Sequence, residues 1–215
     1  KNYMNKKNII LIGGGGHCKS CIDVIEREKK FKIIGIIDSK EKLGQKILNY
    51  PIIGTDSDIE EIAKKCDYFL ITLGQIMSSQ SRIKLFKKVK ELGKCMPTII
   101  SPTSTVSNHT NIGEGTIIMH NAVINALSTI GQNCIINTGA LIEHDSFIKD
   151  HCHISTKATI NGKCTINNGT FIGSGAIINH GLEIANNCII GSGTVVIKSI
   201  TDENTTWYGN PAIKK

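Results

Sequence analysis

An aliphatic residue recurs at every sixth position in the C-terminal half of the chain. From Val106 to Val196, sixteen consecutive positions at this spacing carry Ile or Val without a break. An α-helix cannot keep a period of six on one face, and a single strand has a period of two. The period is typical of a hexapeptide β-helix, in which three units form one coil of a triangular prism. The aliphatic residues are therefore predicted to fill the prism.

Small residues occupy the positions two places before these aliphatic residues, with Leu182 as the exception. We expect them to face inward, which makes Cys134, Cys152, Cys164 and Cys188 core residues rather than reactive ones. Asn and Gly recur between the units and predict corners with left-handed or otherwise unusual dihedral angles. These corner residues are Asn111, Gly113, Asn125, Gly131, Asn137, Asn161, Gly173, Asn179 and Gly191.

Apolar runs alternate with helical patterns in the first hundred residues, which is typical of βαβ units with a short parallel sheet. Ser101-Pro102 marks the junction, so we expect an α/β Rossmann-like domain at residues 1–100 and a β-helix domain with a C-terminal tail at residues 101–215. Strands are predicted at 8–13, 32–38, 51–54, 68–73 and 95–100, and helices at 20–30, at 56–65 with Asp56 as N-cap, and at 79–92.

Composition and charge exclude several classes of protein. A hydrophobic fraction of 40% in 215 residues excludes a disordered chain, and no apolar run is long enough for a membrane helix or an export signal. We therefore expect a cytoplasmic protein whose eight cysteines are reduced. The net charge is +8 for residues 1–100 and −1 for the rest. Because the lysines of 84–90 follow a helical spacing, we interpret them as a solvated helix face and not as a nucleic-acid site.

Four glycines, Gly13, Gly14, Gly15 and Gly16, lie between the first predicted strand and the first helix. Backbone N–H groups of such a turn and the positive end of the helix can hold phosphate. Asp38, at the end of the second strand, is placed to meet a ribose. The dinucleotide fingerprint is incomplete because its third glycine would fall at Cys18, so phosphate or nucleotide binding is favoured over NAD. Cys18 and Cys21 are interpreted as core residues rather than a redox pair.

Six of the seven histidines lie in the β-helix half, and three fall within Glu143-His144-Asp145 to His151-Cys152-His153. Outward-facing polar residues and a metal site remain alternatives for this group. An imidazole beside a carboxylate is the usual general base near neutral pH, which favours that role for His144. For His153, a role as general base and a role as an ordinary outward-facing polar residue are equally supported. The histidines at 109, 120 and 180 are interpreted as solvated.

The segments Ile12-Gly13-Gly14-Gly15-Gly16-His17, Gly35-Ile36-Ile37-Asp38, Glu143-His144-Asp145 and Gly209-Asn210-Pro211-Ala212, together with the hexapeptide array, resemble the PglD/NeuD-like bacterial sugar acyltransferases. The resemblance covers nearly the whole chain. It implies a left-handed parallel β-helix, a homotrimer with active sites between subunits, acetyl-CoA along the coils, and a nucleotide sugar against the glycine-rich loop, without a metal.

The resemblance also implies roles for individual residues. His144 corresponds to the catalytic base and Asp145 to its carboxylate partner, while His153 and Gly162 correspond to residues that face the thioester. The predicted contacts to the nucleotide sugar are the glycine loop, His17, Asp38 and Asn137. The predicted acetyl-CoA site comprises His153, Gly162, Gly191, Gly209, Asn210 and Pro211.

By the same resemblance, the expected activity is N-acetylation of a nucleotide-linked 4-amino-4,6-dideoxy sugar, with UDP favoured as the carrier, in the synthesis of bacterial surface glycans. A sialic acid or other sugar O-acetyltransferase is the close alternative, because spacing cannot separate amine from hydroxyl acceptors. An NAD-dependent oxidoreductase and a non-catalytic solenoid are more distant alternatives. NADH binding would support the first, and failure to release thiol from acetyl-CoA would support the second.

Overall fold

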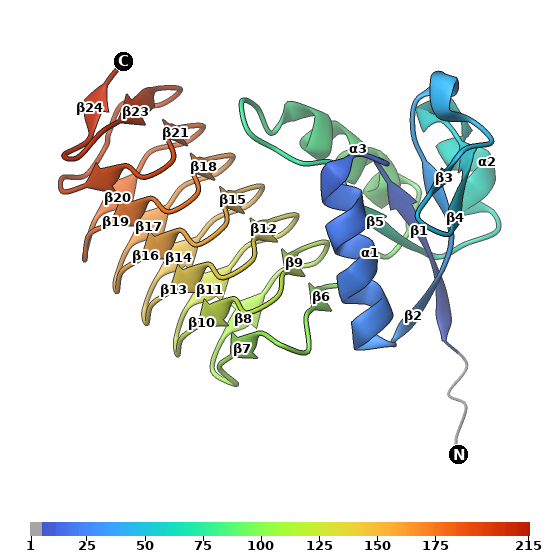
Figure 1. Ribbon diagram of the computed structural model, residues 1–215, viewed down its shortest axis with the longest axis horizontal. Coiled ribbons are helices and arrows are strands. Elements are labelled where there is room, and N and C mark those ends of the chain that lie inside the picture. The colour runs from blue at the N-terminus through green and yellow to red at the C-terminus, as the bar shows by residue number, and fades with distance from the viewer. Residues whose placement is uncertain (1–5) are drawn as a thin grey trace.

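The computed structural model describes residues 6–215 as an α/β layered unit followed by a long prism of short strands (Figure 1). Strands β1 (Lys7–Ile12), β2 (Phe31–Ile37), β4 (Tyr50–Gly54) and β5 (Tyr68–Ile71) pair in parallel, and β3 (Lys46–Ile47) pairs antiparallel with β4. The strand order β3-β4-β2-β1-β5 reverses beside β1. In open parallel sheets, this reversal opens a crevice at the carboxyl ends of the strands.

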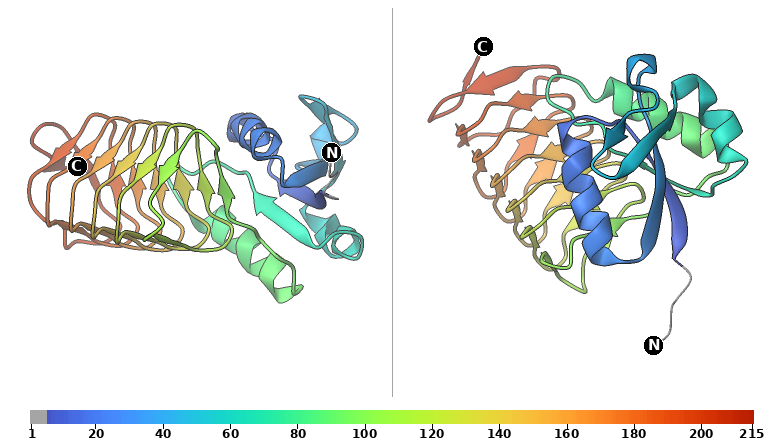
Figure 2. Two further views of the ribbon diagram at one scale, coloured as in Figure 1. Left: turned by 90° about the horizontal axis from the view of Figure 1, so that it is seen from below. Right: turned by 45° about the vertical axis from the view of Figure 1, so that its right-hand side comes forward.

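Three helices cover the two faces of this sheet. On one face, α1 (Gly16–Glu28) lies between the sheet and the prism, and its Ile22 and Ile25 share a core with Ile117 and Ile135 of the prism (Figure 2). On the other face lie α2 (Ile59–Ala63) and α3 (Gln80–Glu91). Short 3₁₀ turns cover Lys40–Lys42 and Asp56–Asp58. The two parts of the chain are therefore joined by a continuous apolar core.

Predicted boundaries in this half are wrong at three points. The first helix begins at Gly16 and not at residue 20, so Gly16 is part of the helix. Thr55, and not Asp56, caps the turn before α2, because its N–H donates to Asp58 Oδ2 at 2.8 Å and the Thr55 hydroxyl contacts the same oxygen. The predicted strand 95–100 does not close the sheet. Only Cys95 bridges to Tyr68, whereas Ile99–Ile100 form β6 and pair with the prism. An apolar dipeptide fits a solenoid strand as well as a sheet edge, so the sequence pattern could not separate the two.

The prism consists of two-residue strands that repeat every six residues and stack into three parallel sheets, one on each side. One side contains β7-β10-β13-β16-β19-β22, the second β8-β11-β14-β17-β20, and the third β6-β9-β12-β15-β18-β21, which faces α1. A hairpin of β23 (Thr206–Tyr208) and β24 (Ile213–Lys214) extends the third side. The strands are β7 Thr105–Val106, β8 Asn111–Ile112, β9 Ile117–Ile118, β10 Val123–Ile124, β11 Thr129–Ile130, β12 Ile135–Ile136, β13 Leu141–Ile142, β14 Phe147–Ile148, β15 His153–Ile154, β16 Thr159–Ile160, β17 Thr165–Ile166, β18 Phe171–Ile172, β19 Ile177–Ile178, β20 Glu183–Ile184, β21 Ile189–Ile190 and β22 Val195–Val196.

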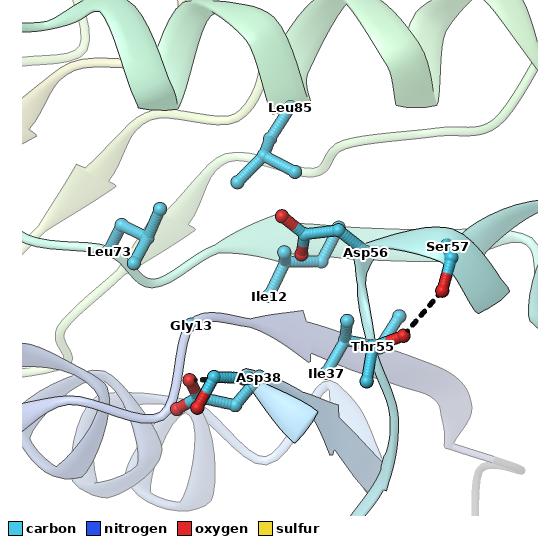
Figure 3. A pocket seen from close by; sticks show the side chains of 10 residues that line it. Ile12, Gly13, Ile37, Asp38, Thr55, Asp56, Ser57, Leu73 and Leu85 are labelled. Atoms are coloured by element: carbon cyan, nitrogen blue, oxygen red, sulfur yellow. Dashed lines mark hydrogen bonds between the residues drawn. The ribbon is translucent and has the colours of Figure 1, made fainter. Parts of the chain in front are cut away.

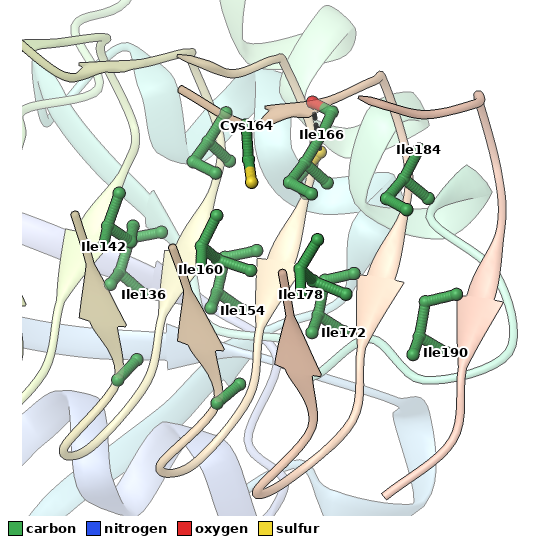
Figure 4. Close-up of a cluster of buried hydrophobic side chains, with 14 of the residues drawn as sticks. Ile136, Ile142, Ile154, Ile160, Cys164, Ile166, Ile172, Ile178, Ile184 and Ile190 are labelled. Atoms are coloured by element: carbon green, nitrogen blue, oxygen red, sulfur yellow. Dashed lines mark hydrogen bonds between the residues drawn. The ribbon is translucent and has the colours of Figure 1, made fainter. Parts of the chain in front are cut away.

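The periodic aliphatic residues fill the prism, as predicted (Figure 4). Each residue stacks on its counterpart eighteen positions later, so Ile136 lies on Ile154 and Ile154 on Ile172. Full burial of an isoleucine contributes about 1.5–3 kcal/mol, which makes this column the main source of stability for the prism. Cys134, Cys152, Cys164 and Cys188 are also fully buried inside it and form no disulfide. Their expected role as core residues is confirmed.

The corners lie at other residues than predicted. Left-handed backbone recurs every six residues, at Gly115, Asn121, Leu127, Asn133, Gly139, Asp145, His151, Lys157, Lys163, Gly169, Gly175, Gly181, Asn187 and Gly193. The predicted corner glycines instead allow coils to approach closely. A Cβ at Gly113 would lie 2.6 Å from the nitrogen of Gln132, and one at Gly173 would lie 2.5 Å from the nitrogen of Ser192. These glycines are therefore needed for stacking between coils, and not for a turn.

Candidate active site

The turn between β1 and α1 presents free backbone N–H groups to open space. Gly15 caps α1 in an extended conformation and has no side chain that could accept a hydrogen bond from the N–H groups of the first helical turn. A Cβ at Gly15 or Gly16 would meet nothing within 4 Å. Unpaired N–H groups at the positive end of a thirteen-residue helix form a site for a phosphate or another anion.

Gly13 and Gly14 hold this turn against the neighbouring strands. Gly13 has a left-handed φ of 107°, and a Cβ there would lie 2.7 Å from the side chain of Leu73. A Cβ at Gly14 would lie 2.5 Å from Asp38 Oδ2, whose carboxylate accepts a hydrogen bond from the Gly14 N–H at 2.7 Å. The two glycines therefore bring the end of β1 and the end of β2 into contact.

Asp38 is anchored by three donors. Its Oδ2 accepts from Gly14 N and from Lys42 Nζ at 2.9 Å, and its Oδ1 accepts from Ser39 N at 2.6 Å. Burial alone would raise the pKa of Asp38, but the hydrogen bonds from Lys42, Ser39 and Gly14 outweigh it and lower that pKa below its ordinary value. The carboxylate is therefore ionised at neutral pH and lies where an acidic residue meets a ribose in nucleotide-binding sheets.

A cavity of about 380 Å³ opens beside this loop, at the carboxyl ends of β1, β2 and β4 (Figure 3). Its size is within the range of small-ligand sites. It combines apolar walls with carboxylates and hydroxyls, and its lining residues are Ile12, Gly13, Ile37, Asp38, Ser39, Thr55, Asp56, Ser57, Leu73 and Leu85. The cavity, the loop and Asp38 together form a site that fits a nucleotide.

His153 lies on β15 and is buried beneath the loop that follows β5. Its Nδ1 donates to the carbonyl oxygen of Gln75 at 2.6 Å, since a carbonyl can only accept. Nε2 is then the unprotonated nitrogen and accepts from Asn137 Nδ2 at 3.1 Å. Burial lowers the pKa of His153 to about 4; the Gln75 contact raises it and the charge of Arg82 lowers it. His153 is therefore neutral at pH 7, with one fixed tautomer.

His17 lies near His153, with 6.5 Å between the ring centroids. Its Nε2 is 3.3 Å from Cys21 Sγ, and burial raises the pKa of that thiol, so the protonated thiol donates to the ring. Burial, Arg82 and His153 lower the pKa of His17 to about 3. His17, from one part of the chain, thus lies near His153, from the other, and His153 in turn bonds Asn137. Both cysteines of the Cys-x-x-Cys motif are fully buried, as predicted.

Arg82 holds the loop after β5 and the prism together by hydrogen bonds, and the sequence did not predict this role. Its guanidinium is fully buried and donates to the carbonyl oxygens of Ile71 and Leu73 and to both oxygens of Asn133 at a prism corner. Gln75 likewise donates to the carbonyl oxygen of His151 at 3.0 Å. These bonds hold the loop after β5 over the prism. Nothing in the sequence distinguishes Arg82 from the exposed lysines around it on α3.

His144 and Asp145 form a dyad at a corner between β13 and β14 (residues 143–146). Asp145 has a left-handed φ of 59°, and its Oδ2 lies 2.7 Å from His144 Nδ1. A carboxylate only accepts, so Nδ1 carries the proton and Nε2 has a free lone pair. The His144 side chain is 53% exposed. This dyad has the arrangement of a general base and its orienting carboxylate.

Gly162 lies one coil above this dyad. A Cβ there would lie 2.9 Å from both Cε1 and Nε2 of His144, so only glycine leaves the imidazole its present position. Within residues 6–215, no protein acceptor takes the Gly162 N–H. The free lone pair of His144 and an unpaired backbone donor therefore lie on adjacent coils.

The C-terminal residues implied in acetyl-CoA binding lie at the far end of the prism. Gly191 is covered within the chain, because the ring of Tyr208 lies directly against its Cα. Gly209 has a φ of 100° and turns the chain between β23 and β24. Pro211 lines a second cavity of about 280 Å³, together with Trp207 and Lys198. Asn210 immediately precedes it in the same turn. The sequence prediction of a CoA contact stays a prediction for all four residues.

The histidine-rich segment does not form a cluster in space. His144 lies at the corner between β13 and β14, His151 at the next corner, and His153 on the third side. His151 accepts from Asn133 Nδ2 and packs edge-on against Phe86. Among residues 6–215, no group of three potential ligands is placed to hold a metal ion. The described helices include none with the length and apolar character needed to cross a membrane.

His120 is also placed differently than predicted. It is not a solvated side chain, because its Nε2 lies 2.7 Å from Asp23 Oδ2 on α1 and its Nδ1 lies 2.7 Å from Ser101 Oγ. It bridges the two parts of the chain. Its partners lie 97 and 19 residues away in sequence, so no local pattern could have indicated this role.

Comparison with known families agrees with both halves of this description. The profile of the PglD N-terminal domain matches residues 8–89, and the profile of the bacterial transferase hexapeptide (six repeats) matches residues 163–198. No curated protein sequence matches the chain.

Solved structures match over almost the full length. A histidine-to-asparagine mutant of perosamine N-acetyltransferase from Caulobacter crescentus, in complex with CoA and GDP-perosamine, is 28% identical with a TM-score of 0.90, covering 97% of this chain and 96% of that one. The acetyltransferase domain of PglB from Neisseria gonorrhoeae, in complex with acetyl coenzyme A, is 26% identical with a TM-score of 0.91, covering 98% of this chain and 100% of that one.

The predicted fold class is therefore confirmed as an α/β Rossmann-like unit followed by a left-handed parallel β-helix. Both family profiles and these structures agree that the chain combines a PglD N-terminal domain with a bacterial transferase hexapeptide region and is similar over almost its full length to acetyl-CoA-dependent sugar N-acetyltransferases.

Proposed function

We propose that this chain transfers the acetyl group of acetyl-CoA to the amine of a nucleotide-linked amino sugar. The observation that carries the proposal is the His144 dyad, whose free Nε2 lies against Gly162 on the next coil. The anion site at the start of α1 supports a nucleotide-linked acceptor. The neighbours solved with CoA and GDP-perosamine or with acetyl coenzyme A support the same pair of substrates. The 4-amino-4,6-dideoxy sugar suggested by the sequence resemblance is the first acceptor to test.

The proposed reaction is a direct transfer without a covalent enzyme intermediate. The amine attacks the thioester carbonyl, so that a C–N bond forms and the carbonyl oxygen becomes negative. His144 Nε2 takes the proton that the amine loses, and Asp145 stabilises the resulting imidazolium. The unpaired Gly162 N–H is the donor proposed for the oxyanion. The C–S bond then breaks, and the CoA thiolate takes up the proton from His144.

We further propose that two copies of the chain form each active site within a homotrimer. His144 and Gly162 lie at the corner between the sides that contain β13 and β14, whereas Asn137, His153 and the glycine loop lie at the third side, which contains β15. In a triangular prism, that corner is opposite the third side. One chain therefore keeps the base away from the nucleotide site, and a neighbouring copy in a closed ring can supply it.

The function is tested by mass spectrometry after incubation with acetyl-CoA and a panel of nucleotide-linked sugars. We expect one added acetyl group on a 4-amino sugar and an equal amount of free CoA thiol. Acetylation of hydroxyl acceptors, such as sialic acid, with no reaction at amines would instead support the O-acetyltransferase alternative. Release of no thiol with any acceptor in the panel would contradict the proposal.

A further inference from the structure

The cavity beside the glycine loop has two carboxylates that differ in what they bind within the chain. Asp38, at the end of β2, already accepts from Gly14, Ser39 and Lys42. Asp56 lies in the 3₁₀ turn after β4, and its carboxylate projects into the space between Leu85 and Ile12 (Figure 3). Within residues 6–215 it takes part in no side-chain hydrogen bond or ion pair. Asp56 lines the cavity and is exposed to solvent, so its carboxylate is open to a ligand.

The backbone of Asp56 is held in place although its side chain is free. Lys88 Nζ donates to the Asp56 carbonyl oxygen at 2.7 Å, and the bonds between Thr55 and Asp58 close the turn on either side. The carboxylate therefore stands on a backbone turn that is held in place, although the side chain itself makes no bond within the described residues. It faces a cavity whose walls include Ile12, Ile37, Leu73 and Leu85. Apolar walls with a small number of placed polar groups are typical of sites for small organic ligands.

The chemistry of an ionised carboxylate discriminates between nucleobases. It has two acceptor oxygens and no donor. Guanine presents two adjacent donors, N1–H and the exocyclic N2–H₂, so it can form a bidentate, charge-assisted pair. Uracil presents one N3–H between two carbonyl oxygens, and one of these oxygens would face the second carboxylate oxygen. Adenine and cytosine each place a ring acceptor beside their amino group. Of the four bases, only guanine matches both oxygens.

We propose that Asp56 is a specificity-determining residue that binds the guanine edge, and that the nucleotide carrier is GDP. This inference rests on the proposed function, in which Asp38 meets the ribose and the glycine loop meets the diphosphate. It differs from the sequence resemblance, which favoured UDP. GDP-perosamine in the Caulobacter crescentus neighbour is consistent with a guanine carrier.

Isothermal titration calorimetry of the full chain with GDP and with UDP tests this assignment without acetyl transfer. We expect GDP to bind at least about tenfold more tightly than UDP, because a charge-assisted pair is lost with uracil. Asp56→Asn should weaken GDP binding at least about tenfold. It should also tighten UDP binding, because the amide accepts from N3–H and donates to O4. Glu60→Gln removes a charge on α2 outside the cavity and should leave both affinities unchanged.

Wild-type protein that binds UDP as tightly as GDP, or binds neither, would overturn the assignment, and this measurement does not depend on any variant. Unchanged GDP affinity in Asp56→Asn would overturn it as well. The proposed function would be contradicted by a different result from the one that contradicts the role of Asp56. GDP preference without acetylation of any GDP-linked amino sugar would contradict acetyl transfer and leave base recognition standing. Acetylation of a UDP-linked sugar alone, with no GDP binding, would contradict guanine recognition by Asp56 and leave the proposed acetyl transfer standing.

Discussion

Replacing His144 with alanine is expected to lower kcat by about 10²–10⁴-fold, the usual contribution of a positioned general base. The free Nε2 of His144 is the proposed acceptor for the amine proton, and within residues 6–215 no other imidazole lies at that corner with a carboxylate on its second nitrogen. Steady-state release of CoA thiol at a saturating acceptor concentration measures the effect. The KM values should change little, because the proposed role of His144 is in proton transfer.

Two expected results separate this chemical role of His144 from a structural one. His144 is exposed and contributes nothing to the apolar column, so His144→Ala should keep the wild-type Tm. His109→Ala removes another exposed histidine from the same edge of the prism and should keep wild-type turnover. Near-normal turnover in His144→Ala would contradict the assignment of the base.

Replacing Gly15 with aspartate is expected to weaken nucleotide binding about 100-fold or more while the fold is kept. A side chain at Gly15 meets no protein atom, and aspartate is among the best N-cap residues, so the helix itself is not harmed. The new carboxylate would accept the N–H groups proposed to hold the diphosphate, and it would repel phosphate by several kcal/mol. Calorimetric titration with the nucleotide measures the loss, and thermal unfolding measures the fold.

Gly15→Ser is the matched control for this variant, because serine caps the helix without adding a charge. It should lose much less affinity than Gly15→Asp and show a similar Tm. Wild-type nucleotide affinity in Gly15→Asp would show that phosphate does not bind at the start of α1. A strongly lowered Tm would instead contradict the open space seen around Gly15.

Most of the architecture could be predicted because it follows from local repetition. The period of six fixes which residues point inward, so Ile136 and Ile154 could be assigned to the core from the sequence alone. The corner positions could not, because an asparagine or glycine serves equally for left-handed backbone and for close stacking of coils. Gly113 shows the difference, since the backbone of the next coil, and not its own φ, excludes a side chain there. Ile99 shows the same limit for pairing, because two apolar residues do not specify a partner strand.

The candidate site could be predicted only in parts. The glycine loop, Asp38 and the His144–Asp145 pair are short motifs whose residues are neighbours in sequence. Arg82 and Gln75 act through bonds to residues 51 and 76 positions away, and His120 acts through Asp23, 97 positions away. Such partners are set by how the two halves of the chain dock. The position of His144 on the edge opposite His153 likewise became visible only in three dimensions.

Each active site is proposed to join the His144 corner of one copy to the glycine loop of another. Co-expression of His144→Ala and Gly15→Asp, followed by purification of hybrid oligomers carrying both affinity tags, tests it directly. Every trimer that carries both variants has one shared site of three with neither substitution, so we expect roughly a third of wild-type acetyl transfer. Hybrid oligomers no more active than either parent variant, or a chain that is monomeric by light scattering, would contradict the account.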